Sequence, residues 1–198
     1  MKNLKYESAK LISQSANNLV KVIPSASFEF WQRKDFRLYV EFKNLPQIEQ
    51  DRIFNELEIS LLGLFILHLE NAILTTNSPE QRLIYSSLKG DLVPSFLQLF
   101  QEQGIEKKYI NQWNILIDMR LKEYRQDYMT AYEETKNLSE LKEGKEFLKI
   151  AWARIETITI DCLTHIKRGK TEADDPLWQL LRKWIISLDS QLSGLTKA

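Results

Sequence analysis

Cysteine, glycine and proline are scarce in this chain of 198 residues, with one, six and five copies respectively. A single cysteine cannot close a disulfide within the chain, which excludes a small disulfide-stabilised fold. The six glycines are scattered, so the closely spaced glycines of a phosphate-binding loop or a dinucleotide-binding fingerprint are missing. Zinc-ligand spacings and the Gly-x-Ser-x-Gly hydrolase motif are missing too. The sequence therefore carries no catalytic motif and favours a protein that is not an enzyme.

An excess of charge is also missing, because 27 Lys and Arg residues balance 27 Asp and Glu residues. Nucleic-acid binders need surplus positive charge, so we expect no nucleic-acid partner. The longest apolar run, residues 59–74, is shorter than the roughly 20 residues of a membrane span and is interrupted by polar side chains. The N-terminal segment is too polar for a secretory signal. Together with the single cysteine, these features predict a soluble cytoplasmic protein without a membrane partner.

Apolar residues are present in quantity, at 43% of the chain, and mostly recur at steps of three and four. That spacing is typical of amphipathic helices that bury one stripe. The number of residues suits one compact domain with its own core. We therefore predict an all-α fold in which residues 1–198 form a single helical domain, a bundle of about six or seven helices around a central apolar helix at 46–75.

The five prolines divide this helical pattern. Pro46, Pro79 and Pro176 are predicted to stand at helix starts, where the missing N–H has no partner to lose. Pro24 is predicted to close the first segment. Pro94 falls inside an apolar stretch, so a break or kink is expected there.

Residues 28–42 fit two patterns. Phe36, Leu38 and Val40 alternate with polar residues, as in a strand. Phe28, Leu38 and other apolar residues of the segment also fit helical steps, and no Asn-Gly or Asp-Gly turn divides the segment. A helix is favoured here, with a short β-hairpin as the alternative.

The segment 46–75 is apolar on all sides, which indicates a helix enclosed by others. Gly63 in such a helix marks a place where another helix comes close. His68 continues the stripe of Leu61 and Leu64, and Glu70 continues the opposite face. Both side chains are therefore expected to be buried and to need polar partners.

Arg120 is the predicted partner of Glu70, because it stands in the apolar stripe of a later helix. In the first interpretation these two form a buried ion pair and His68 is a core histidine with its own hydrogen bonds. In the second, His68, Glu70, Arg120 and Tyr124 line a pocket in which Arg120 holds an anionic group of a small-molecule ligand.

A metal site is a third possibility. Asp161 and His165 lie one turn apart, and with His68 and Glu70 they would form a carboxylate-rich set of ligands. The Glu-x-x-His step of di-metal bundles is absent, so no cofactor is assigned. Cys162 lies one turn before His165, but its place in an apolar stripe predicts a core thiol rather than a nucleophile.

The leading hypothesis for function is a non-enzymatic helical interaction module that acts through protein–protein contacts and self-associates, as a homodimer or another homo-oligomer. Its predicted interface residues are Tyr128, Tyr132, Trp178 and Ile186, because aromatic and apolar side chains away from the main stripes favour protein contacts. The alternative is a small-molecule-binding or enzymatic bundle that uses the pocket of His68, Glu70 and Arg120.

Overall fold

The computed structural model describes residues 2–135, 145–171 and 174–196, and seven α-helices account for most of them. In chain order these are α1 (Lys2–Trp31), α2 (Lys34–Tyr39), α3 (Gln47–Thr75), α4 (Pro79–Glu102), α5 (Lys107–Glu134), α6 (Glu146–Lys167) and α7 (Pro176–Thr196), with a 3-10 turn, η1 (Phe42–Asn44), before α3. The predicted all-α bundle is confirmed. Residues 28–42 lie in α1, α2 and η1 and the turns joining them, so the hairpin alternative is wrong.

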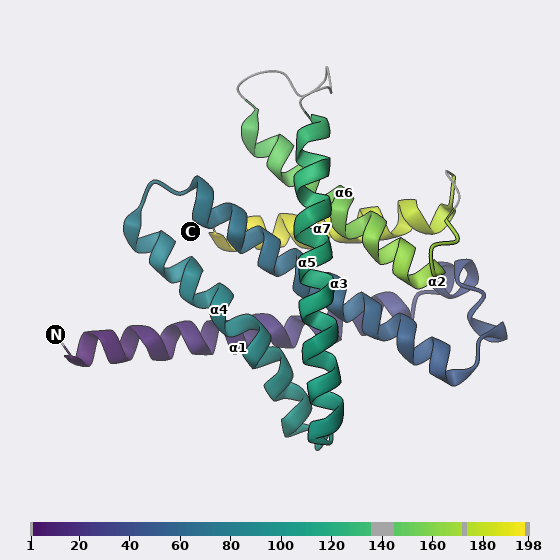
Figure 1. Cartoon of the computed structure of the whole chain (residues 1–198), viewed down its shortest axis with the longest axis horizontal. Helices are drawn as coiled ribbons and strands as arrows, with labels where there is room; N and C mark the ends of the chain where they lie inside the picture. The colour runs from purple at the N-terminus through teal and green to yellow at the C-terminus, as the bar shows by residue number, and fades with distance from the viewer. Residues whose placement is uncertain (1, 136–144, 172–173, 197–198) are drawn as a thin grey trace.

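Helix α3 is the central element, and α1, α4, α5, α6 and α7 all pack against it (Figure 1). Every residue from 59 to 69 is buried, as the apolar pattern predicted. By length and composition alone α3 could cross a membrane, but 78% of its most apolar window is buried inside the protein, as in the core helix of a soluble protein. Its hydrophobicity is therefore weak evidence for a membrane span.

Three helix starts follow the predicted proline positions. Ser78 precedes Pro79, and its side chain accepts a hydrogen bond from the backbone N–H of Gln81 at 3.2 Å. Asp175 precedes Pro176 and accepts from the backbone N–H of Leu177 at 2.9 Å. Pro46 is the residue before the first turn of α3. Side-chain caps of this kind satisfy N–H groups that the first turn leaves free.

The two remaining prolines do not interrupt their helices. Helix α1 continues through Pro24 and α4 continues through Pro94, so the predicted segment end and break are wrong. The two helices pack against each other and against α3. Burial of apolar side chains along these contacts offsets the roughly 3 kcal/mol that an interior proline costs a helix.

The close approach predicted at Gly63 is made by α5. A Cβ atom on Gly63 would lie 2.5 Å from two ring carbons of Tyr124 and 3.2 Å from Cδ1 of Ile158 on α6. The Tyr124 ring is fully buried, and its hydroxyl lies 3.4 Å from Oγ of Ser60. The flat ring of α5 therefore occupies the space that any side chain at position 63 would need.

Replacing Gly63 with alanine is expected to destabilise the protein by about 1–3 kcal/mol, because the buried ring has no free space into which to move. Gly90→Ala is the matched control: Gly90 lies inside α4, and a Cβ atom added to it would have nothing within 4 Å. There alanine should stabilise by up to about 1 kcal/mol through helix propensity. Urea unfolding of the three proteins measures both effects, and a Gly63→Ala protein as stable as the wild type would contradict this packing.

Candidate functional site

Four helices meet in a buried polar cluster centred on Arg154 of α6. Its Nε and Nη2 donate to the two carboxylate oxygens of Asp189 on α7, at 2.7 and 2.9 Å. Its Nη1 donates to Oδ1 of Asn71 on α3 at 2.6 Å, and Nδ2 of Asn71 donates to the hydroxyl of Tyr128 on α5 at 2.9 Å. Nδ1 of His68 lies 3.4 Å from Oδ1 of Asp189. We call these five residues the Arg154 cluster.

The charges of Arg154 and Asp189 balance each other. Burial raises the pKa of Asp189, but hydrogen bonds from His68 and Arg154 outweigh burial and hold that pKa below its usual value. Asp189 is therefore ionised and balances the charge of Arg154. Because an ionised carboxylate only accepts hydrogen bonds, Nδ1 of His68 is assigned as a donor to Asp189.

A cavity of about 520 Å³ opens beside the cluster, between α3, α4, α6 and α7. Arg154, Asn71 and His68 reach it, although they are only 4%, 6% and 7% exposed. The rest of its lining mixes hydroxyl, amide and apolar groups: Ala72, Thr75, Thr76, Gln81, Tyr85, Glu146, Phe147, Ile150, Ala151 and Ser193. Small-molecule binding sites are typically cavities with a few buried polar groups in their lining.

Of the four residues predicted to line a pocket, only His68 lines this cavity. Glu70 is half-buried at the surface, where it pairs with Arg125 at 2.8 Å and Lys89 at 3.5 Å. Tyr124 is packed against Gly63.

Arg120 pairs with Glu56 at 2.9 Å and with Glu123 at 3.3 Å. The predicted Glu70–Arg120 ion pair is therefore wrong. Helices α3 and α5 cross where Gly63 lies against Tyr124. Arg120 lies one turn before Tyr124 on α5, and its partner Glu56 lies before Gly63 on α3. Glu70 lies beyond the crossing and meets Arg125 instead.

The predicted metal ligands do not come together. His68 belongs to the Arg154 cluster, whereas Nε2 of His165 lies 3.0 Å from Oε2 of Glu123. Burial raises the pKa of Asp161 to about 8, and the nearby acids Asp127 and Glu123 add to this. Within the described ranges, no group of three or more His, Cys, Asp or Glu side chains is placed to hold a metal ion.

Cys162 is fully buried, as its apolar stripe predicted, and burial raises the pKa of its thiol to about 12. A thiol with this pKa stays protonated at neutral pH and is a poor nucleophile. His165, the base considered for it, is paired with Glu123.

The four predicted interface residues are each partly buried within the chain. The rings of Tyr128 and Tyr132 stack with centroids 6.2 Å apart, and the Tyr132 hydroxyl donates to Glu146. Trp178 packs against the apolar core near α2, and Ile186 is half-covered. None of these four side chains is fully exposed, and their role in an interface stays a prediction.

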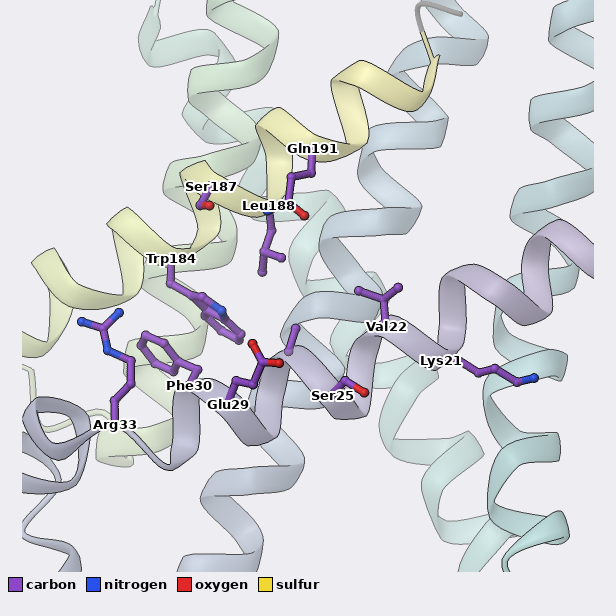
Figure 2. A pocket seen from close by; sticks show the side chains of 11 residues that line it. Lys21, Val22, Ser25, Glu29, Phe30, Arg33, Trp184, Ser187, Leu188 and Gln191 are labelled. Carbon is purple, nitrogen blue, oxygen red and sulfur yellow. The ribbon is translucent and has the colours of Figure 1, made fainter.

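A second hollow of about 630 Å³ lies between α1 and α7 (Figure 2). Phe30 and Trp184 stack at one end, with ring centroids 4.2 Å apart. Its polar side chains, among them Glu29, Ser187 and Gln191, are exposed. Because none of its charged groups is buried, this groove is a weaker candidate for specific binding than the cavity beside the Arg154 cluster.

No family model, curated protein or solved structure matches the chain. Its function is therefore inferred from the geometry of these hollows. Sequence reasoning missed three residues of the cluster: Arg154, Asp189 and Asn71. Arg154 could have been found, because it lies in one stripe with Ala151 and Ile158, where a charged group needs a buried partner.

Replacing Asp189 with asparagine is expected to destabilise the protein by about 3–5 kcal/mol, because the Arg154 charge stays buried without its counter-ion. Arg125→Ala is the control, since it breaks the Glu70 pair at the surface, where Arg125 is 48% exposed. That change should cost at most about 1 kcal/mol. Guanidinium chloride unfolding at neutral pH compares the two variants, and equal losses would mean that the cluster is not a buried charge pair.

Proposed function

We propose that the protein binds a small, uncharged polar molecule in the cavity beside the Arg154 cluster. The observation that carries the proposal is that Arg154, Asn71 and His68, each more than nine-tenths buried, line a space of about 520 Å³. Fixed donors and acceptors of this kind select a ligand by its hydrogen-bonding pattern.

The charges around the cavity favour a neutral ligand. Asp189 already neutralises Arg154, so an anion would have to displace a paired carboxylate. Glu146, the other charged residue of the lining, lies at the exposed rim beside Lys149, 3.8 Å away. The proposal assigns binding and no reaction, and it places the protein in the cytoplasm on the composition of the chain.

Ala151→Phe tests this proposal, because Ala151 is half-buried in the lining, makes none of the Arg154 hydrogen bonds, and a phenyl ring there would take up part of the cavity. Native mass spectrometry of the purified protein should detect a retained small molecule in the wild type and lose it in this variant. Where none is retained, a panel of sugars, polyols and amides should raise the melting temperature of the wild type and not of the variant.

Ile160→Phe is the matched control, because it adds a comparable ring to an exposed position of the same helix. It should bind as the wild type does. Equal binding by the Ala151→Phe protein, or no stabilisation of the wild type by any compound of the panel, would refute the proposal.

Self-association is the second candidate, and it is favoured by a row of apolar residues on α5. Ile115, Met119 and Met129 are 61%, 59% and 58% exposed. With Lys122 and Gln126 they follow steps of four and three residues along the helix, the spacing of a helix that packs along a partner helix. Helix α5 lies at the outside of the bundle (Figure 1), and the occupant we propose is α5 of a second copy.

Light scattering coupled to gel filtration tests the second candidate. The wild type should have the mass of a dimer, and Met119→Lys should shift it to the monomer because it puts a second lysine one turn before Lys122 and removes one of the three exposed apolar side chains. Leu38→Lys on α2, 72% exposed and away from the row, is the control and should leave the dimer intact. A monomeric wild type at high protein concentration would rule the dimer out.

A further inference from the structure

A smaller hollow of about 270 Å³ lies between α3, α4 and α5, and Pro24 of α1 also lines it. Its lining combines one carboxyl group with aromatic rings, and it contains no lysine or arginine. The lining residues are Pro24, Phe54, Asn55, Glu58, Phe96, Leu99, Phe100, Gln103, Ile105 and Trp113. We call this hollow the Glu58 pocket.

Glu58 is buried without a partner. It is 3% exposed, and it makes no hydrogen bond or ion pair with any residue that the structure describes. Four other buried carboxylates of the described residues have a basic partner: Glu56 pairs with Arg120, Glu156 with Arg182, Asp175 with Lys167, and Asp189 with Arg154. Asp161 is the exception, and it does not line this pocket. Burial alone raises the pKa of Glu58 to about 8. The ionised form of this carboxyl group is costly in the folded chain, so the group is mostly protonated at neutral pH unless a cation reaches it from outside.

Four aromatic rings line the same pocket as this carboxyl group. Phe96, Phe100 and Trp113 pack against one another in a triangle: the Phe100 centroid is 4.9 Å from that of Phe96 and 4.7 Å from that of Trp113, and the Phe96 and Trp113 centroids are 5.9 Å apart. Phe54, one turn before Glu58 on α3, adds a fourth ring. Aromatic faces attract cations, most strongly where water is excluded.

We propose that the Glu58 pocket binds a small organic ammonium ion, with Glu58 as its counter-ion and the four rings as its cage. A bare metal ion is a poor fit, because one carboxylate and two amide side chains supply too few ligands for calcium or magnesium. A cavity of about 270 Å³ holds a cation of only a few heavy atoms. The site is separate from the cavity beside the Arg154 cluster, with which it shares no lining residue.

Binding in the Glu58 pocket has a defined pH dependence. Glu58 is the one titratable residue in the lining, and the cation binds its ionised form, so binding releases a proton. With a pKa of about 8, the ionised fraction rises roughly tenfold for each pH unit below that value and levels off above it. Affinity for an ammonium ion should therefore increase from pH 6 to pH 8 and change little beyond pH 9.

The test measures binding of choline and of n-butylammonium to the full-length protein at pH 8. Calorimetry and the indole NMR signal of Trp113 both report the binding. At least one probe should bind saturably with one-to-one stoichiometry. Its uncharged analogue of the same shape, 3,3-dimethylbutan-1-ol or butan-1-ol, should bind at least about tenfold more weakly. Comparable affinity for the uncharged analogue, or no binding of either ammonium ion, would overturn the proposal.

Glu58→Gln keeps the shape of the side chain and removes its charge, so it should weaken ammonium binding at least about tenfold and abolish the pH dependence. Glu106→Gln is the control: Glu106 is exposed, pairs with Lys108 at 3.0 Å, and should leave binding unchanged. Trp113→Leu is a second variant that should also weaken binding, should Glu58→Gln fail to fold.

Ala151→Phe, which would take up part of the other cavity, should bind the ammonium ion as the wild type does, so the two proposals fail separately. Binding that is insensitive to Glu58→Gln and to pH would contradict the assigned counter-ion.

Discussion

The contact between Gly63 and the ring of Tyr124 sets the relation between α3 and α5, on which the polar architecture depends. The ring lies where a side chain at position 63 would be, so the two helix backbones approach closely at this one point. Partners along both helices then follow in order: Glu56 meets Arg120 before the crossing, and Asn71 meets Tyr128 after it. A shift of either helix by one turn would break both pairs and leave the charges of Glu56 and Arg120 unpaired. The close approach at Gly63 therefore fixes the polar contacts between the two helices.

The same crossing explains why the acids of α3 have such different surroundings. Glu56 lies on the side of α3 that faces α5 and α6, where Arg120 reaches it. Glu58, two residues on, points to a different side of the helix, toward the phenyl rings of α4 and the proline of α1. No cation is placed on that side of α3 in the pocket lining, so the carboxyl group stays unpaired. Two acids of one helix turn therefore differ in whether they have a basic partner, because they lie on different sides of the helix.

The sequence was sufficient to predict the central helix, its enclosure and the close approach at Gly63, because periodicity and residue size report directly on burial. It was not sufficient to predict which partner each buried charge takes, because the Glu70–Arg120 assignment depended on a helix register that only packing determines. Helix continuation through Pro24 was missed for a related reason, since tertiary contacts of α1 outweigh the local preference. The burial of Arg154 could have been predicted from the sequence, because Arg154 interrupts an apolar stripe as Arg120 does.

The two internal sites differ in what they can offer a ligand, and this difference follows from their charges. In the Arg154 cluster, Asp189 neutralises the charge of Arg154. The cavity beside the cluster therefore presents hydrogen-bonding groups but no unbalanced charge. A ligand there gains by matching those groups, and a net charge on it would only lose hydration. In the Glu58 pocket the carboxyl group has no basic partner, so a bound cation would supply the counter-ion that the protein does not provide. The preference for a neutral ligand in one site and for a cation in the other thus follows from the packing of the helices, which places Arg154 beside Asp189 and no basic residue in the lining of the Glu58 pocket.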